Sequence, residues 1–273
     1  MKLWFEHRGQ RYQADGDTGI SLALPLDFAG SQPSFYGVEP ATARALEAGG
    51  FVGDTERGGS CNVESLELIP HCHGTHTESI AHLSHAFTEP PRPPAWMAAR
   101  VVSVMTHACK QTGETYPPPG QADEAVISRA DLSAVDIDTP ALIVRTRPND
   151  PAKRQRQYQG DNPHPYFTLE AIDWLLHRGV DHLLVDTPSI DRGRDDGSLP
   201  AHRRFWALDA DRQPTQETVA ERTVTEFVFV PDEVPDGLYL LNLQLPDWCT
   251  DAVPSRPVVF SLALAASIRE EGD

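Results

Sequence analysis

The sequence predicts a single mixed α/β domain with largely antiparallel sheets and peripheral helices. Short apolar stretches rich in β-branched residues recur along the chain, one segment has clear helical periodicity, and no internal repeat is present. A chain of 273 residues can bury a large core without disulfide bonds. We therefore expect residues 1–273 to form one domain.

The N-terminal part is predicted to be rich in strands. Residues 3–5 and 11–13 flank a polar turn, which predicts a hairpin. Residues 20–28 predict a strand, and Pro25 places that strand at an edge or an end. Residues 66–69 predict another strand, which leads directly into a histidine-rich turn.

Two helices are expected. The shorter one covers residues 41–48 and would be ended by the Gly-Gly pair that follows it. The longer one covers residues 168–178, with Thr168 as the N-cap and Gly179 in the left-handed position after the last turn. Its apolar residues share one face, as expected for a helix on a core: Leu169, Ile172, Leu175 and Leu176.

Six further apolar segments predict strands: residues 101–105, 141–145, 182–186, 224–230, 237–245 and 258–264. The segments at 224–230 and 237–245 alternate well and are expected to pair antiparallel through the turn at 231–236. Three proline-bearing stretches, at 90–94, 117–119 and 148–165, have core-like strands on both sides. They are predicted to be surface loops within one domain instead of linkers between two.

The chain is acidic, with 23 Lys and Arg residues against 40 Asp and Glu residues and a formal net charge of −17. Nucleic acids and anionic membrane surfaces require clustered basic side chains, so neither is an expected partner. No segment approaches the roughly 20 apolar residues of a membrane-spanning helix. Four scattered cysteines form no disulfide framework and no signal-peptide core is present, so the cytoplasm is the expected location.

The strongest chemical signal is a cluster of histidines. Five of the eleven histidines lie between His71 and His85, together with Cys72, Gly74 and Glu78. Imidazole, thiolate and carboxylate groups bind divalent metals such as zinc and manganese. In an extended backbone, the side chains of His76 and Glu78 point to the same side.

Four interpretations of this cluster are weighed: structural histidines, a metal or catalytic site, a metal-storage tract and a nucleophilic cysteine. A single histidine is usually an ordinary structural residue, but five with a Cys and a Glu favour a metal or catalytic site. A metal-storage tract would be terminal and of low complexity, whereas this segment follows a predicted strand. A nucleophilic Cys72 is the weaker alternative, because its neighbours are of the type that bind metals.

These residues resemble a known signature. Gly74-Thr75-His76-Thr77-Glu78, followed by His82 and His85, is similar to the motif His-x-Gly-Thr-His-x-Asp-x-Pro-x-His of the cyclase-type metal-dependent hydrolases. That family includes bacterial kynurenine formamidase (arylformamidase) and isatin hydrolase. The resemblance extends over about residues 60–260 through the segments 168–180, 185–191, 201–202, 225–226, 234–239 and 254–258.

The resemblance implies a swivelling β/β/α fold and a set of site residues. It assigns His85 as the general acid/base and places Asp186, Ser189 and Asp191 where they shape the site. It assigns the metal ligands to Cys72, His76, Glu78, His82, His202 and Glu226. The family's first histidine falls on Cys72, so either that thiolate or the neighbouring His71 is the ligand, and a thiolate suits zinc better than manganese.

The activity implied by this resemblance is hydrolysis of a small amide by metal-activated water. The leading expectation is an arylformamidase, which converts N-formylkynurenine to kynurenine and formate. The alternatives are a hydrolase of a cyclic lactam or lactone of the isatin hydrolase type, or a non-catalytic member that binds a metal or ligand. A divalent metal, zinc more than manganese, and a homodimer or homotetramer are implied in the same way.

Overall fold

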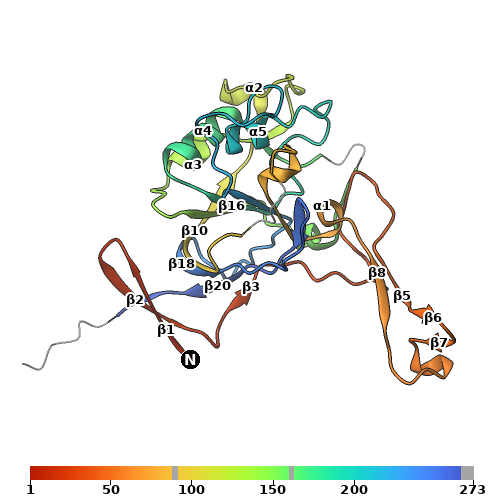
Figure 1. Cartoon of the computed structure of the whole chain (residues 1–273). Coiled ribbons are helices and arrows are strands. Elements are labelled where there is room, and N and C mark those ends of the chain that lie inside the picture. Colours follow the sequence, from red (N-terminus) through yellow and green to blue (C-terminus); the bar gives the residue numbers. More distant parts are fainter. Residues whose placement is uncertain (88–91, 160–162, 266–273) are drawn as a thin grey trace, which may run out of the picture.

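A nine-stranded mixed sheet forms the centre of the computed structural model, which describes residues 1–87, 92–159 and 163–265 (Figure 1). Its strands, in spatial order, are β19 (Ala252–Pro254), β9 (His76–Glu78), β17 (Thr223–Glu226), β16 (His182–Val185), β13 (Ala141–Arg147), β10 (Trp96–Met105), β18 (Gly237–Asn242), β20 (Val258–Ser261) and β3 (Ile20–Ser21). The four middle strands, from β17 to β10, are parallel, and the outer strands on both sides pair antiparallel. The predicted mixed fold with largely antiparallel sheets is confirmed.

Helices cover one face of this sheet (Figure 1). They are α2 (Cys109–Thr112), α3 (Arg129–Ser133), α4 (Leu169–His177) and α5 (Pro200–Trp206). Val102 and Leu183 of the strands form one buried cluster with Ile172 of α4. The prediction for residues 168–178 is confirmed, because the Thr168 hydroxyl accepts a hydrogen bond from the Ala171 N–H and Gly179 has a φ of +76°.

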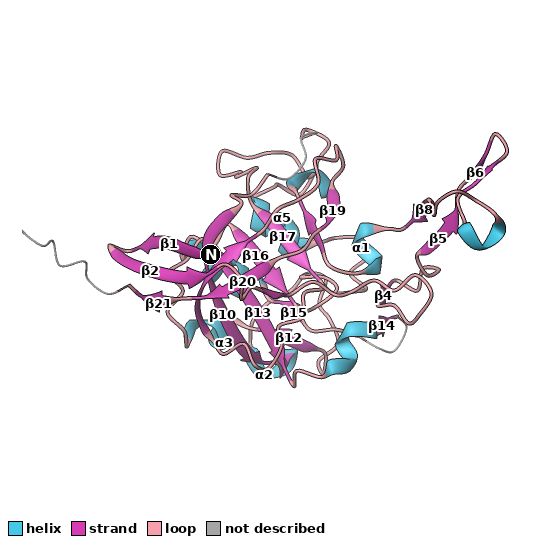
Figure 2. Ribbon diagram, turned by 90° about the horizontal axis from the view of Figure 1, so that it is seen from below, coloured by secondary structure: helices cyan, strands magenta, loops and turns pink. Residues whose placement is uncertain are grey.

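The opposite face of the sheet carries a second buried cluster. Val101 belongs to this cluster while its neighbour Val102 belongs to the first, as the alternation of side chains along a strand requires. Beyond it, β1 (Lys2–His7), β2 (Gln10–Asp15) and β21 (Ala263–Leu264) form a separate three-stranded sheet, seen at one end of Figure 2. The predicted N-terminal hairpin is therefore confirmed.

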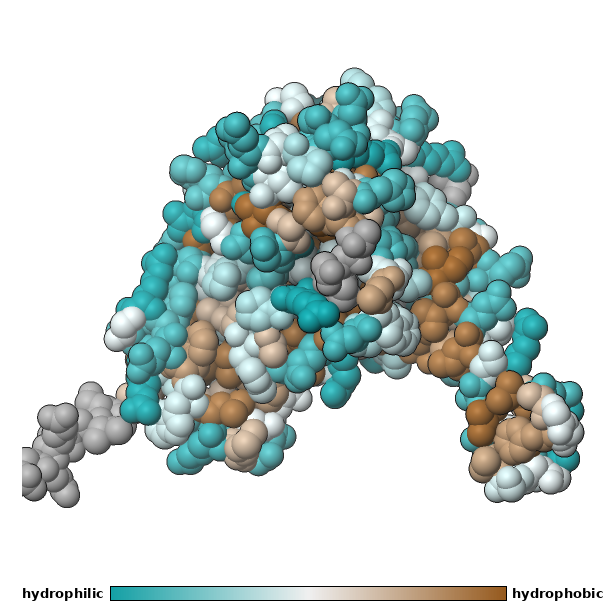
Figure 3. Space-filling view, viewed as in Figure 1, coloured by the Kyte–Doolittle hydropathy of each residue, from teal (hydrophilic) through white to brown (hydrophobic). Residues whose placement is uncertain are grey.

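The helix predicted at residues 41–48 is wrong. This segment forms β5 (Thr42–Ala45) and β6 (Glu47–Ala48), which pair with β8 (Glu64–Glu67) and β7 (Phe51–Val52). The two glycines at 49 and 50 have φ angles of +58° and +85°, so they build a two-residue hairpin turn instead of ending a helix. The resulting arm projects from the body of the molecule, and Figure 3 shows hydrophobic side chains on it.

Several strand predictions were too long. The strands expected at 66–69 and 237–245 end at Glu67 and Asn242, and the one expected at 258–264 is divided between β20 and β21. The strand expected at 224–230 ends at Glu226, because Phe227 takes a positive φ of +56° and turns the chain. It does not pair with β18 as expected, since β16, β13 and β10 lie between the two strands. The strand expected at 20–28 is limited to β3 and an isolated bridge between Ala23 and Val228.

The remaining elements are short: β4 (Ser34–Phe35), β11 (His107–Ala108), β12 (Ala125–Ile127), β14 (Gln157–Tyr158), β15 (Tyr166–Phe167), α1 (Pro70–His73) and the 3₁₀ turns Thr55–Arg57, Ile80–His82 and Pro151–Gln155. The expected loop at 117–119 is irregular, and residues 90–91 and 160–162 of the other two stretches lie outside the described residues. None of the described helices has the length and apolarity that crossing a membrane requires.

Candidate metal centre

The histidine-rich segment is folded by a short helix, a sharp turn and a central strand. Pro70 starts α1, and Gly74 then takes a φ of +142°, which L-residues rarely adopt. The chain continues into β9, which lies between β17 and β19. His76 is the partner of Glu226 in the β9–β17 register, so two segments 150 residues apart place their side chains together.

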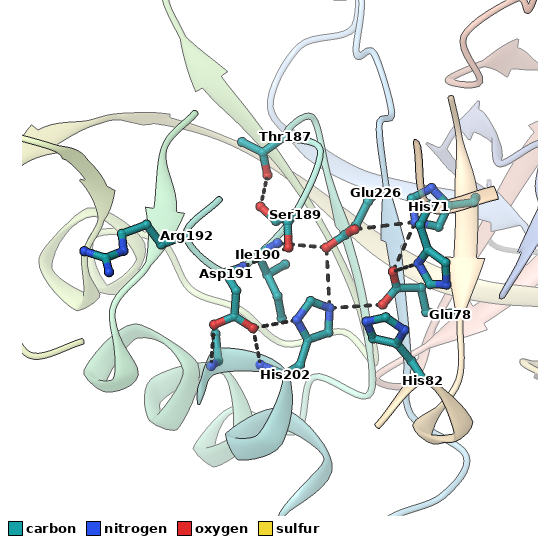
Figure 4. Close-up of polar contacts among 12 residues, drawn as sticks. His71, Glu78, His82, Thr187, Ser189, Ile190, Asp191, Arg192, His202 and Glu226 are labelled. Atoms are coloured by element: carbon teal, nitrogen blue, oxygen red, sulfur yellow. Dashed lines mark hydrogen bonds and ion pairs between the residues drawn. The ribbon is translucent and has the colours of Figure 1, made fainter. Parts of the chain in front are cut away.

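Buried acidic and imidazole groups face one another at this point, as Figure 4 shows. The His76 Nε2 atom lies 3.1 Å from Glu78 Oε1 and 3.5 Å from Glu226 Oε2. The His202 Nε2 atom, from α5, lies 3.0 Å from Glu78 Oε2 and 3.5 Å from Glu226 Oε1. All four side chains are at most 3% exposed.

A second group of donor atoms adjoins the first through His71. Its Nδ1 atom lies 2.7 Å from Glu78 Oε1, and its Nε2 atom lies 2.8 Å from Asp251 Oδ2. His82 contacts the same Asp251 oxygen through Nδ1 at 3.3 Å. The donor atoms fall into three groups in which all atoms lie within 4.8 Å of one another: His71, His76 and Glu78; His71, His82 and Asp251; and Glu78, His202 and Glu226.

Asp251 was missed by the sequence analysis. It stands directly before β19, and β19 pairs with β9, so the carboxylate reaches His71 across 180 residues of sequence. No local motif marks it, because an aspartate after Trp-Cys-Thr is an ordinary loop residue in sequence.

Cys72 and His71 are separated by the geometry of α1. His71 belongs to two of the donor groups, whereas among the described residues the Cys72 sulfur belongs to none. Cys72 is buried, and this burial, together with the Glu226 carboxylate, raises the pKa of its thiol to about 11. Neighbouring residues in a helix point about 100° apart, so His71 and Cys72 leave α1 in different directions, and only the His71 side chain joins the donor groups.

Two other histidines of the segment stand outside the cluster. The His73 Nε2 atom bonds the Glu39 carbonyl oxygen, and its Nδ1 atom accepts from the Ile69 N–H, which fixes the turn around α1. His85 is exposed and makes no hydrogen bond or ion pair with the described residues. The structure therefore leaves His85 apart from the groups it brings together.

Asp191 fixes the orientation of His202. Its Oδ2 atom accepts hydrogen bonds from Nδ1 of His202 at 2.6 Å and from the His202 backbone N–H at 3.0 Å. The turn before it positions Glu226, because the Ile190 N–H donates to Glu226 Oε1 at 2.8 Å. Asp186 instead pairs with buried Lys153 at 2.9 Å. Asp191 and Ile190 thus orient His202 and Glu226, while Asp186, which follows β16, bonds Thr146 and Lys153 instead of the cluster ligands.

The electrostatics of the cluster favour ionised groups. Burial lowers the pKa of His71, but the carboxylates of Glu78 and Asp251 outweigh burial and raise it to about 10. Burial also opposes the charge on His202, yet the nearby carboxylates, Glu78 first, raise its pKa well above the usual value. Burial raises the pKa of Glu78, but the surrounding histidines bring it well below its ordinary range. The site therefore concentrates negative charge that a cation or protons must balance.

A divalent cation fits these residues. The Glu78 Oε2 and His202 Nε2 atoms are fully buried, face each other at 3.0 Å and have no hydrogen-bond partner among the described residues. Buried polar atoms nearly always form hydrogen bonds. A carboxylate oxygen and an imidazole nitrogen that face each other at 3.0 Å without one therefore fit a shared metal ion. Nitrogen and oxygen donors suit both zinc and manganese, and the thiolate argument for zinc does not apply to this donor set.

A cavity of about 380 Å³ lies near the cluster. None of the donor-group residues lines it, but Tyr158 of its wall contacts the Phe227 ring, which in turn contacts His76. Aromatic side chains form much of its wall: Phe35, Tyr36, Tyr158 and Tyr166. His164 lines it as well, and its Nε2 atom bonds the backbone oxygen of Asp191, the residue that holds His202. Asp191 therefore links His164 of the cavity wall to His202 of the cluster through hydrogen bonds.

Comparisons with known proteins agree with this geometry. The model of the Cyclase family matches residues 20–192. The fold is similar to a predicted metal-dependent hydrolase from Bacillus stearothermophilus, at 13% identity and a TM-score of 0.57 over 89% of this chain and 98% of that one. It is also similar to isatin hydrolase A from Ralstonia solanacearum, at 18% identity and a TM-score of 0.57 over 89% of this chain and 91% of that one. A third similar structure is an isatin hydrolase bound to the product analogue thioisatinate, at 13% identity and a TM-score of 0.57 over 91% of this chain and 93% of that one.

These likenesses establish the fold, and the swivelling β/β/α architecture expected from the motif is confirmed. No curated protein matches the sequence. The family model covers more than half of the chain, including α1, β9 and the turn that holds Asp191. The chain therefore belongs to the cyclase family.

Proposed function

We propose that the protein is a metal-dependent hydrolase of a small aryl-bearing amide or lactam. The observation that carries this proposal is the buried set of two carboxylates and two histidines, in which Glu78 and His202 present unpartnered atoms to each other. Such a set is costly to bury unless a cation compensates it.

We assign the metal-binding role to residues from four different elements. His71, His76, Glu78, His202 and Glu226 would hold the ion. His82, the further ligand implied by the motif, lies in the adjoining donor group with His71 and Asp251. A bound divalent ion supplies Lewis-acid activation of water and of a carbonyl group. Asp191 keeps the Nδ1 proton of His202, so that the Nε2 lone pair is directed into the cluster.

His85 remains the proposed proton donor to the leaving nitrogen. It follows His82 by three residues, and its imidazole is exposed to solvent. An imidazole can both donate and accept a proton, which suits this task. Replacement by Gln is expected to lower kcat and leave the metal content unchanged.

The substrate class rests on the cavity and on what the related structures bind. One neighbour was solved with thioisatinate and another with benzyl benzoate, both aromatic ligands. The aromatic wall beside the cluster here suits a ring of the same kind. A lactam such as isatin is therefore the first substrate to test, and arylformamidase action on N-formylkynurenine is the second candidate.

The test measures metal content and turnover on the same preparation. Purified protein is chelated, reloaded with zinc or manganese, and assayed with isatin and N-formylkynurenine. Turnover that is lost on chelation and restored by one metal supports the proposal and identifies the ion. Stoichiometric metal without turnover of any aryl amide would refute the catalytic role and leave the non-catalytic alternative.

We also propose that the chain forms a homodimer or homotetramer in the cytoplasm. The projecting arm exposes Leu46, Leu66 and Ile69, which a second copy would cover. All four cysteines are unpaired, as is usual for a reducing compartment. Sedimentation velocity of the native chain, and of a variant with Leu66→Asp, distinguishes a monomer from an oligomer.

A further inference from the structure

The cavity beside the metal cluster has a polar group that the proposed chemistry does not use. His164 is 5% exposed and lies edge-on to two aromatic rings, with centroid distances of 5.2 Å to Phe35 and 5.8 Å to Tyr158. It lines the cavity, yet it is a member of none of the donor groups that fit a metal.

The hydrogen bonds of His164 determine its tautomer. Its Nε2 atom lies 2.9 Å from the backbone oxygen of Asp191, and a carbonyl oxygen only accepts, so Nε2 carries the proton. Burial lowers the pKa of His164, which keeps the ring neutral. In a neutral imidazole the other nitrogen is then an acceptor, and Nδ1 has no hydrogen-bond partner among the described residues.

The carboxylate of the same wall, Glu124, is already engaged. Glu124 Oε2 accepts from the Tyr166 hydroxyl and from the Gln121 N–H, both at 3.1 Å, and lies 3.5 Å from Arg192. Figure 4 shows that the Arg192 side chain points away from the metal cluster. His164 Nδ1 is thus a buried acceptor set among aromatic rings of the cavity wall, whereas the Gln121 and Gln159 side chains on the same wall are exposed.

We propose that His164 Nδ1 accepts a hydrogen bond from the N–H of a substrate aryl amide or lactam whose ring lies against the aromatic wall. This inference rests on the proposed function and adds to it a residue that determines specificity. The enzyme would then select secondary amides, because an N-methyl group offers no proton and leaves the buried acceptor unpaired.

The test compares isatin with N-methylisatin in the wild-type protein and in His164→Gln. The Gln amide N–H can still donate to the Asp191 oxygen, but its oxygen is not at the position of Nδ1. Wild-type kcat/KM is expected to favour isatin, and the variant should reduce that preference about tenfold. The ratio between the two proteins cancels the intrinsic difference in reactivity between the two compounds.

His177→Gln, at an exposed position on α4, is the matched control and should keep the wild-type preference. Binding of both compounds is also measured by calorimetry, which does not depend on turnover. An unchanged preference in folded His164→Gln would overturn the inference and leave the hydrolase proposal standing. Selective binding of isatin, with no turnover of isatin or N-formylkynurenine, would overturn the hydrolase proposal alone. Failure of the wild-type protein to bind either isatin compound would overturn the inference alone.

Discussion

Two buried histidines hydrogen-bond to the same residue, Asp191, and their pKa values are shifted in opposite directions. His202 donates to the carboxylate at 2.6 Å, whereas His164 donates to the backbone carbonyl at 2.9 Å. The carboxylates around His202 outweigh its burial and raise its pKa, while burial dominates for His164 and lowers its pKa. Asp191 therefore bonds a histidine of the charged cluster with its side chain and a histidine of the aromatic cavity wall with its backbone oxygen.

The comparison shows that the surroundings decide what a buried imidazole does. His202 faces Glu78 and Glu226 within 3.5 Å, so a positive charge is stabilised there by nearby negative charge. His164 packs between aromatic rings, where an ion would lose its hydration without compensation. The first environment suits a metal ion and the second a neutral hydrogen-bond acceptor.

The largest effect is expected from removing a negative charge from the cluster around His202. Glu78→Gln keeps the size of the side chain and removes its charge, so metal should be lost and turnover should fall by about 1000-fold or more. Metal analysis by mass spectrometry and steady-state kinetics measure both. Glu217→Gln, on an exposed loop, should change neither, and full activity in Glu78→Gln would show that the reaction takes place elsewhere.

Variants of the neighbouring residues His71 and Cys72 test which of the two is the metal ligand. His71→Gln should weaken metal affinity by more than about 100-fold, because losing a ligand costs more than losing one of its supporting contacts. Cys72→Ala should leave the affinity unchanged and lower stability by about 1 kcal/mol, the typical effect of a small buried truncation. Competition with a metal-binding dye gives the affinities, and the reverse order of effects would make Cys72 the ligand.

Asp191→Asn tests the residue that joins the two environments. The change removes the charged acceptor for His202 and should reduce metal affinity by about 10- to 100-fold. Tyr116→Phe is the matched control, since it removes one hydrogen bond to Asp191 Oδ1 and leaves His202 bonded. Equal losses in both variants would mean that Asp191 acts only on general stability.

The smallest effect is the contribution of neutral, buried His164 to the pH dependence of stability. Because the pKa of His164 is lower in the folded protein than in the unfolded chain, the unfolded state binds more protons below about pH 6.5. Stability should therefore fall as the pH drops from about 7 through the folded pKa, and this part of the fall should be absent in His164→Gln. Thermal unfolding of chelated protein at several pH values measures it, and identical pH profiles for both proteins would contradict it.

Local features in the sequence sufficed for some elements and failed for others. The helix from Leu169 to His177 was predictable because its cap, apolar face and terminal glycine lie within twelve residues. The segment 41–48 was mispredicted because its partner, Glu64–Glu67, is distant, and pairing overrode helix propensity. The pairing of β17 was likewise decided by the parallel strand beside it instead of by the next strand in sequence.

The sequence by itself determined the chemistry of this protein: a cluster of imidazoles and carboxylates, with His76 and Glu78 on one side of a strand, in a chain of the cyclase family. Only the tertiary structure decided that His71 instead of Cys72 faces the cluster, that Asp251 joins it, and that His164 lines the cavity next to it. The physical reason is that side-chain direction within a strand follows a fixed period of two. The meeting of distant residues instead depends on which strands and helices pack together, and no short stretch of sequence specifies that.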